Sequence, residues 1–223
     1  MARKILFFFG PPASGKGTQA EKLAQQLGLP AISTGDLLRR NNQLAGEYKS
    51  AMNEGQLVAD EVINDLLIER LSQADAEKGF ILDGYPRTKT QFEYFYNNII
   101  KSEDKACAIE ISVSEPEIYN RLAGRRFCPQ CGAGYHLLYK PSQQPGICDK
   151  CQTALEQRPD DTEDIIKERL GLYQRTMGPL VALWWQMGEL IIIKGEKEID
   201  QVNDDILEAL EEDGFLKLKP EII

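Results

Sequence analysis

A glycine-rich stretch near the start of the chain, Gly10–Thr18, has the residue types of a phosphate-binding loop and reads GPPASGKGT. Such a loop has the pattern G-x-x-x-x-G-K-[ST], in which backbone N–H groups and the lysine hold phosphates while the hydroxyl reaches Mg²⁺. Here Gly17 follows Lys16, and the hydroxyl of Thr18 comes one residue late. The alternative is a tight turn that contains a lysine by chance. The stretch predicts a phosphate site whose metal ligand must be found elsewhere.

A candidate for that ligand is Asp83, which directly follows the apolar run Phe80–Leu82 and precedes Gly84–Arg87. If the run is a strand of an open α/β sheet, Asp83 lies at its carboxyl end, where such sheets bind ligands. An aspartate there can organise Mg²⁺ directly or through its waters, so a loop hydroxyl is useful but dispensable. The alternative is a turn residue before glycine. The presence of Arg87 four residues later favours the metal-binding interpretation.

Two cysteine pairs, Cys128-x₂-Cys131 and Cys148-x₂-Cys151, are separated by sixteen residues. This spacing is typical of a closed tetrahedral Zn²⁺ site, which is structural because four thiolates leave no open position for catalysis. Two disulfides are the alternative, but thiols in the cytoplasm are kept reduced. Iron also binds such sites. We expect a structural metal, with zinc as the favoured ion.

The elements that must position these residues alternate between strands and helices. A continuous apolar run, typical of a buried parallel strand, occurs at Ile5–Phe9, and further strands are predicted at Phe80–Leu82, Ala106–Val113 and Leu190–Ile193. Helical periodicity occurs at Thr18–Leu27, Asp60–Ser72, Pro116–Leu122 and Asp161–Gln174. This alternation predicts an α/β fold with a doubly wound parallel sheet. The phosphate loop then joins a strand to a helix N-terminus, which attracts anions.

The segment 127–156 breaks this rhythm, because it is rich in Cys, Gly, Pro and Gln and contains short aromatic pieces. We expect a small β-rich insertion between two helices. His136 lies within it, and we expect this histidine to stay outside the metal site because four cysteines fill the coordination sphere. The fifth cysteine, Cys107, falls in a predicted strand and is expected to be an inert buried thiol.

The net charge of −9 is concentrated near the end of the chain. Glu196–Asp213 holds nine acidic residues and one lysine, a balance of −8, so the remainder is close to neutral at −9 − (−8) = −1. Apolar residues at helical spacing predict a solvated surface helix there, and an acidic partner-binding tail is the alternative. The absence of a lysine-rich stripe with aromatics disfavours nucleic acid. The run Ile5–Phe9 is too short for a signal core or a membrane span, which favours a cytoplasmic protein.

Taken together, these motifs resemble those of the adenylate kinases, within the wider nucleoside monophosphate kinase family. The resemblance extends from Lys4 to about Asp205. The matching motifs are Gly15–Thr18, Ile32–Arg39, Gln56–Val58 and Gly79–Arg87. The loop of that family ends in Gly-Lys-Gly-Thr, so the glycine after the lysine is a family trait.

Three features depart from the family pattern. Ala13 replaces the usual third loop glycine, so its backbone must avoid positive φ or tolerate strain. The helical segment after Arg39 is a few residues shorter than usual, and Lys194-Gly195 replaces the usual Asp-Gly near the adenine. None of these departures removes a charged residue from the matched motifs.

The resemblance implies a P-loop NTPase-type parallel sheet flanked by helices, with a helical monophosphate-binding insertion and a small zinc-bearing lid of the long form. The implied core comprises residues 1–32, 61–124 and 163–223. The monophosphate-binding segment comprises residues 33–60, and the lid comprises residues 125–162. Such enzymes are usually monomers.

The resemblance also implies a role for individual residues. The implied catalytic residues are Lys16, Asp83, Arg87, Arg125, Arg158 and Arg169. The implied ATP-binding residues are Gly10, Ala13, Ser14, Gly15, Lys16, Gly17, Thr18, Arg121, Arg125, Gly134, Tyr135 and Lys197. The implied AMP-binding residues are Thr34, Gly35, Arg39, Gln56, Leu57, Val58, Gly84, Tyr85, Pro86, Arg87, Gln91, Arg158 and Arg169. The implied metal ligands are Cys128, Cys131, Cys148 and Cys151.

The expected reaction is reversible transfer of the γ-phosphoryl group of Mg·ATP to AMP, giving two ADP. Alternatives are another monophosphate kinase, with UMP or CMP as acceptor or GTP as donor, and a binding module without turnover. Thr34 and Gln91 match the positions beside the acceptor base, where the Gln91 amide can both donate to and accept from adenine. The alternative is that Gln91 merely opens the helix after Pro86-Arg87.

Overall fold

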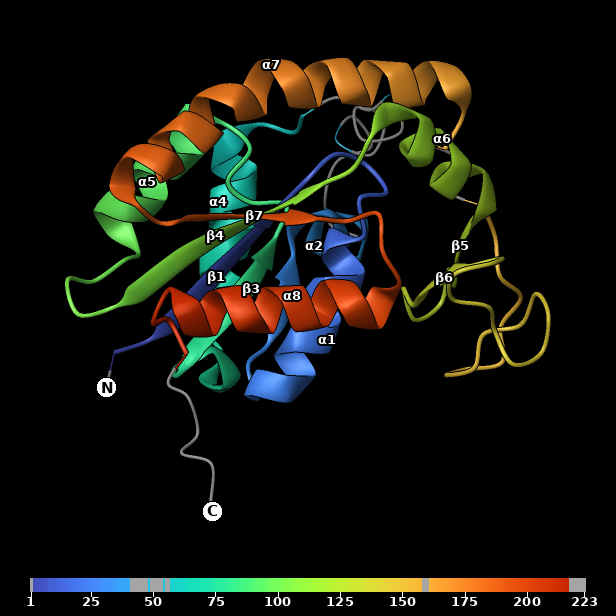
Figure 1. Ribbon diagram of the computed structural model, residues 1–223, viewed down its shortest axis with the longest axis horizontal. Coiled ribbons are helices and arrows are strands. Elements are labelled where there is room, and N and C mark those ends of the chain that lie inside the picture. The colour runs from blue at the N-terminus through green and yellow to red at the C-terminus, as the bar shows by residue number, and fades with distance from the viewer. Residues whose placement is uncertain (1, 41–47, 49–53, 55–56, 158–160, 217–223) are drawn as a thin grey trace.

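The computed structural model describes residues 2–40, 48, 54, 57–157 and 161–216. Its main sheet is parallel, with the strand order β2-β3-β1-β4-β7 (Figure 1). The strands are β1 (Lys4–Phe9), β2 (Ala31–Ser33), β3 (Gly79–Asp83), β4 (Lys105–Ser112) and β7 (Leu190–Lys194). The central strand β1 is apolar along nearly its whole length because both faces of the sheet are covered by helices. The predicted α/β fold with a parallel sheet is confirmed.

Helices cover both faces of the sheet (Figure 1). One face packs against α1 (Lys16–Leu27) and α8 (Ile199–Glu212). The other face packs against α4 (Asp60–Leu71), α5 (Lys89–Asn98) and α7 (Glu163–Met187). The other helices in the described part of the chain are α2 (Thr34–Arg40), the short 3₁₀ helix η1 (Ala74–Ala76) and α6 (Glu115–Gly124).

The core has a cluster of aromatic rings on the α7 side of the sheet. The Phe7 ring lies 4.6 Å from Trp184 and 5.1 Å from Phe95, measured between centroids. On the other side, α8 buries Val202, Ile206 and Leu210 against the sheet. The acidic segment is therefore a surface helix with one apolar face, as the sequence predicted.

The structure differs from the sequence analysis in two elements. The strand β2 was missed, because Ala31–Ser33 is short and is specified by its pairing with β3. The helix expected to end at Gln174 continues to Met187 as α7, with Pro179 inside it. Proline removes a backbone hydrogen bond and crowds the preceding turn, but the helix continues because Leu180 and Trp184 beyond it are fully buried.

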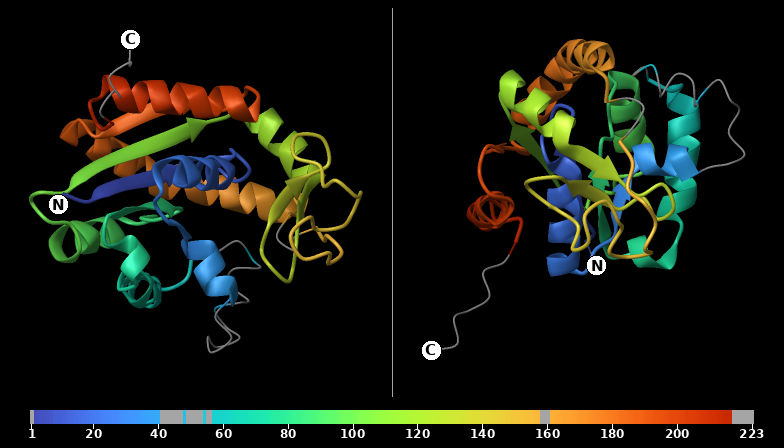
Figure 2. Two further views of the ribbon diagram at one scale, coloured as in Figure 1. Left: turned by 90° about the horizontal axis from the view of Figure 1, so that it is seen from below. Right: turned by 90° about the vertical axis from the view of Figure 1, so that its right-hand side faces the viewer.

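The segment 127–156 belongs to a small domain at one end of the molecule, beyond α6 (Figures 1 and 2). Its strands β5 (Arg125–Phe127) and β6 (Gly134–His136) pair antiparallel. Isolated bridges such as Phe127 with Glu156 close it into a compact unit. The predicted β-rich insertion is confirmed, and we call the small domain that contains it the lid.

Some expectations fall outside the described residues. Gln56, Arg158 and most of the shortened segment after Arg39 belong to this group. In the parts of the chain that the structure describes, none of the helices combines the length and the hydrophobicity required to span a bilayer.

Candidate active site and metal centre

The glycine-rich stretch forms a loop between β1 and α1, as predicted. The loop closes with a hydrogen bond from the backbone N–H of Ser14 to the carbonyl of Pro11. Lys16, the first residue of α1, turns back over the loop and donates from Nζ to the same Pro11 carbonyl at 3.3 Å. Backbone N–H groups at a helix N-terminus, together with a lysine, make a binding site for phosphate.

The structure explains why glycine follows the lysine. Asp83 ends β3 and pairs in register with Phe8 of β1, so its carboxylate faces the start of α1. A Cβ atom at Gly17 would lie only 3.1 Å from Oδ2 of Asp83. A serine or threonine at this position would therefore crowd the carboxylate. The glycine allows Asp83 to approach the loop, where its oxygen ligands suit Mg²⁺.

Lys16 lies within a cluster of charged groups. Burial is the main cause that lowers the pKa of Lys16, to about 8; the positive charges of Arg87, Arg169 and Arg125 act in the same direction, while Asp83 opposes the shift. The predicted catalytic residues that the structure describes therefore lie close enough to Lys16 for their charges to act on its ammonium group. A concentration of positive charge around a phosphate loop is suited to a polyphosphate ligand.

The sequence left two alternatives for Ala13: a backbone without positive φ, or strain. The φ of Ala13 is +58°, so its backbone is strained. Left-handed backbone costs a residue with a Cβ about 1–2 kcal/mol. We expect Ala13→Gly to raise the free energy of unfolding by roughly 0.5–1 kcal/mol, since glycine relieves that strain but is more flexible when unfolded. Thermal unfolding should show a Tm rise of about 1–4 °C.

The matched control is Ala20→Gly within the right-handed α1, where glycine should lower stability by about 1 kcal/mol. A lower Tm for Ala13→Gly than for the unmodified protein would contradict the assignment of strain to Ala13.

Asp161 contacts two of the predicted catalytic arginines and was not singled out from the sequence. Its side chain is fully buried, and Arg125 donates to both of its oxygens, with Nε–Oδ2 at 2.7 Å. Arg169 lies 3.9 Å from the same carboxylate. Asp161 therefore holds together two arginines that would otherwise repel each other. In the sequence, the acidic pair Asp160-Asp161 close to Arg158 could have indicated a carboxylate partner for the arginines.

Several residues that the sequence resemblance assigns to AMP binding form a second network around Gly84. Thr34 Oγ1 and Arg87 Nε both donate to the Gly84 carbonyl, at 3.1 and 2.8 Å. Gln91 is buried, its Nε2 donates to Asp60 at 2.7 Å, and its Oε1 accepts from the backbone N–H of Arg87 at 2.8 Å. The Gln91 amide thus braces Arg87, and it retains one N–H and one lone pair for a ligand.

A cleft of about 980 Å³ brings most predicted site residues together. The predicted residues that line it are Ala13, Ser14, Gly15, Lys16, Gly17, Thr18, Gly35, Arg39, Asp83, Arg87, Arg121, Arg125, Gly134, Tyr135, Arg169 and Lys197. An adjoining cavity of about 70 Å³ is lined by residues that include Gly10, Leu57, Gly84 and Pro86. The Tyr85 side chain is buried in the core, where its hydroxyl donates to Asn64, and Val58 is also buried in the core.

Arg121 lines the same cleft and is held by three hydrogen-bonding partners. Its guanidinium donates to the carbonyls of Ser14 at 3.1 Å and Gly195 at 2.7 Å, and to Glu117 at 2.8 Å. The Tyr139 ring of the lid lies 5.7 Å from the Arg121 guanidinium carbon. Arg121 therefore links α6, the phosphate loop and the lid.

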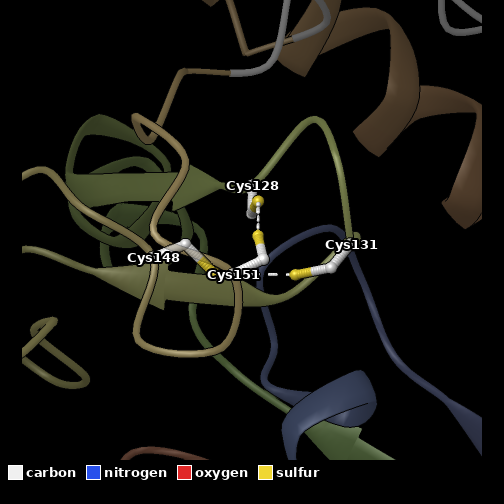
Figure 3. Close-up of side chains that lie close together, drawn as sticks. All are labelled: Cys128, Cys131, Cys148 and Cys151. Atoms are coloured by element: carbon white, nitrogen blue, oxygen red, sulfur yellow. Dashed lines mark hydrogen bonds between the residues drawn. The ribbon is translucent and has the colours of Figure 1, made fainter.

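The four paired cysteines converge as the sequence predicted (Figure 3). Their Sγ atoms all lie within 4.8 Å of one another. The closest pairs, Cys128 with Cys151 and Cys131 with Cys148, are 3.4 and 3.5 Å apart. These distances exclude disulfide bonds, whose sulfurs are about 2 Å apart, so the disulfide alternative is wrong. Four converging thiols fit a tetrahedral metal ion.

The surroundings of the cysteines also suit a metal. A hydrogen bond from Tyr135 lowers the pKa of Cys148 to about 6, which favours the thiolate that a metal requires. His136 is not part of the cluster, as predicted, because Nε2 contacts the Arg121 carbonyl instead. Cys107 is a buried thiol in β4, also as predicted, and burial raises its pKa to about 12.

Comparisons with known proteins agree with this site. A family model described as adenylate kinase matches residues 8–189, which is most of the chain. An adenylate kinase from Methanocella arvoryzae is 45% identical over 208 residues, which is 91% of this chain and 96% of that protein. Adenylate kinases from Archaeoglobus fulgidus and Clostridium acetobutylicum are 42% and 41% identical, over 92% and 93% of this chain and 97% and 99% of those proteins. On these matches and this geometry, the chain belongs to the adenylate kinase family.

Proposed function

We propose that the protein transfers the γ-phosphoryl group of Mg·ATP reversibly to AMP, giving two ADP. The observation that carries the proposal is the convergence of Lys16, Asp83 and three arginines on the loop between β1 and α1. Phosphoryl transfer depends mainly on positioning and charge stabilisation, and this cluster can provide both. The relatives that match nearly the full chain are named adenylate kinase.

Each charged residue has a distinct part in the proposal. Lys16 and the loop N–H groups hold the β- and γ-phosphates of the donor. Arg87, together with Arg39, holds the phosphate of the acceptor, while Arg125 and Arg169 stabilise the group in transfer through their planar, bidentate guanidinium groups. Mg²⁺, held by Asp83 directly or through water, would neutralise charge on the donor phosphates. Arg158 is assigned to the same role as Arg125 on sequence resemblance.

The lid has two proposed roles. When it closes over the cleft it excludes water, which would otherwise consume ATP by hydrolysis. The metal bound by Cys128, Cys131, Cys148 and Cys151 gives this small unit a fixed shape, because so short a segment buries little apolar surface of its own. We propose zinc as the structural ion.

Further parts of the proposal concern organisation and location. The core comprises 1–32, 61–124 and 163–223, the monophosphate-binding segment 33–60 and the lid 125–162. The described cysteines are all free thiols, which supports a reducing compartment such as the cytoplasm. We further propose a monomer that binds ATP, AMP and ADP, and that binds neither nucleic acid nor membranes.

The choice of acceptor is proposed to depend on Thr34 and Gln91. We expect the kcat/KM for AMP to be at least about 10-fold higher than the kcat/KM for UMP. UMP presents a carbonyl in place of the adenine amino group, so buried polar groups would lose their partners at a cost of about 1–3 kcal/mol. Gln91→Ala should reduce this preference and leave the KM for ATP nearly unchanged. Steady-state kinetics with both acceptors provide the measurement.

Because the Gln91 amide also braces Arg87, a matched control is needed. Asp60→Ala removes the partner of Nε2 and leaves the amide in place, so it should retain the AMP preference. Loss of the preference in both variants would assign Gln91 a bracing role only. Equal use of AMP and UMP by the unmodified protein would instead favour a general monophosphate kinase.

A further inference from the structure

Tyr135 connects the cysteine cluster to strand β6. Its ring packs with Cys128, Ala133 and Cys148 and is almost fully buried. The Tyr135 hydroxyl oxygen accepts from the backbone N–H of Asp149 at 2.8 Å and lies 3.4 Å from Cys148 Sγ. A metal-bound Cys148 is a thiolate without a hydrogen, so in the metal-bound protein the Tyr135 O–H donates to the sulfur.

His136, the next residue of β6, faces the opposite side of the strand, as strand geometry requires. Its Nε2 lies 3.0 Å from the Arg121 carbonyl, and its Nδ1 accepts from the backbone N–H groups of Leu138 and Tyr139 at 3.0 and 3.1 Å. These partners require a neutral ring with the proton on Nε2. A Cβ at Gly124 would lie 2.4 Å from the imidazole, so this glycine is what allows the histidine to dock against α6.

The contacts continue from α6 to the phosphate loop. Arg121, whose backbone carbonyl accepts the hydrogen bond from His136, donates through its guanidinium to the carbonyls of Ser14 and Gly195. The Tyr139 ring, held 4.5 Å from the His136 ring, covers the same guanidinium. Direct contacts therefore run without interruption from a cysteine of the metal cluster to the phosphate loop.

We propose that Tyr135 and His136 are positioning residues that couple the lid metal to the donor nucleotide site. With the metal bound, Cys148 fixes Tyr135 and β6, and His136 then fixes Arg121 against the phosphate loop. The inference rests on the proposed function, because it requires the cleft to bind ATP. Since coupling between two binding sites is reciprocal, bound ATP must raise the affinity for the metal by strengthening the same contacts, and we expect this gain to be seen as slower metal release.

Metal release tests the coupling without relying on activity. Zinc-loaded protein is mixed with a colorimetric chelator, with and without ATP. Excess Mg²⁺ keeps ATP from competing for zinc, and AMP is left out so that no phosphoryl transfer occurs. We expect ATP to slow release about 5-fold or more in the unmodified protein. Calorimetry on the same samples reports whether ATP binds.

Two variants separate the steps of the path. Tyr135→Phe keeps the ring but loses the bond to Cys148, so release should accelerate about 10-fold without ATP, and the effect of ATP should disappear. His136→Gln does not touch the cluster, so release without ATP should match the unmodified protein, while protection by ATP should be lost. The matched control Tyr96→Phe removes a hydroxyl bonded to Glu189 in the core, and it should behave as the unmodified protein does.

The failure outcomes are distinct. If ATP binds the unmodified protein and release is equally fast with and without it, the coupling is overturned and the proposed function stands. Full protection by ATP in His136→Gln would also overturn the proposed path, even if Tyr135→Phe retains too little zinc to be measured. If calorimetry detects no ATP binding, the proposed function itself fails.

Discussion

Replacing Lys16 with methionine is expected to reduce kcat roughly 100- to 1000-fold, a loss of about 3–4 kcal/mol in transition-state stabilisation. Methionine keeps much of the aliphatic volume and removes the charge that faces the phosphates. The Tm should not fall, because the charge of Lys16 is disfavoured by burial and by three nearby arginines in the folded protein. Coupled-assay kinetics and thermal unfolding of the purified variant provide the two measurements.

The titration of Lys16 offers a control on the same claim. Lys16 is charged below its pKa of about 8 and neutral above it, so kcat/KM for ATP in the unmodified protein should fall as the pH rises through 8. This fall reports the free enzyme, and Lys16→Met should not show it. Near-normal turnover in the variant would contradict the assignment of the phosphate loop.

Removal of the lid metal is the second large effect that we expect. A ligand present at 1,000 times its Kd stabilises the folded state by about 4 kcal/mol. For a chain of this length, removing a metal bound that tightly should lower the Tm by roughly 8–16 °C. Limited proteolysis should cleave the metal-stripped protein first within residues 127–156. Elemental analysis of protein purified without chelators should find one zinc per chain.

A matched cysteine variant strengthens this test. Cys107→Ala changes a buried thiol in β4, outside the cluster, and should leave the metal content at one per chain. Cys148→Ser should lose the metal and reproduce the proteolysis pattern of the stripped protein. Absence of both zinc and iron from the unmodified protein would show that the cysteine cluster has been misinterpreted.

The sequence predicted the elements that are specified locally. Strand β1 is a continuous apolar run, and the loop after it carries its chemistry in neighbouring residues, so both could be recognised directly. Strand β2 could not, because Ala31–Ser33 acquires its structure by pairing with β3. The end of α7 was missed for a similar reason, since the burial of Trp184 against β1 overrides the local effect of Pro179.

The candidate site shows the same division. The loop, the strand-end aspartate and the cysteine spacing were evident from short motifs. The partners of these residues were not, because Asp161 and Asp60 reach Arg125 and Gln91 through contacts between residues more than 30 positions apart. The reason for Gly17 also emerges only from the fold, where β3 brings Asp83 to within 3.1 Å of the missing Cβ.

The stoichiometry of nucleotides tests the proposed reaction most directly. Purified protein is incubated with ATP, Mg²⁺ and AMP, and the nucleotides are quantified by chromatography over time. We predict that two ADP form for each AMP consumed, and that ADP supplied alone is converted to equal amounts of ATP and AMP. Consumption of ATP that does not depend on AMP, or no conversion in either direction, would contradict the proposal.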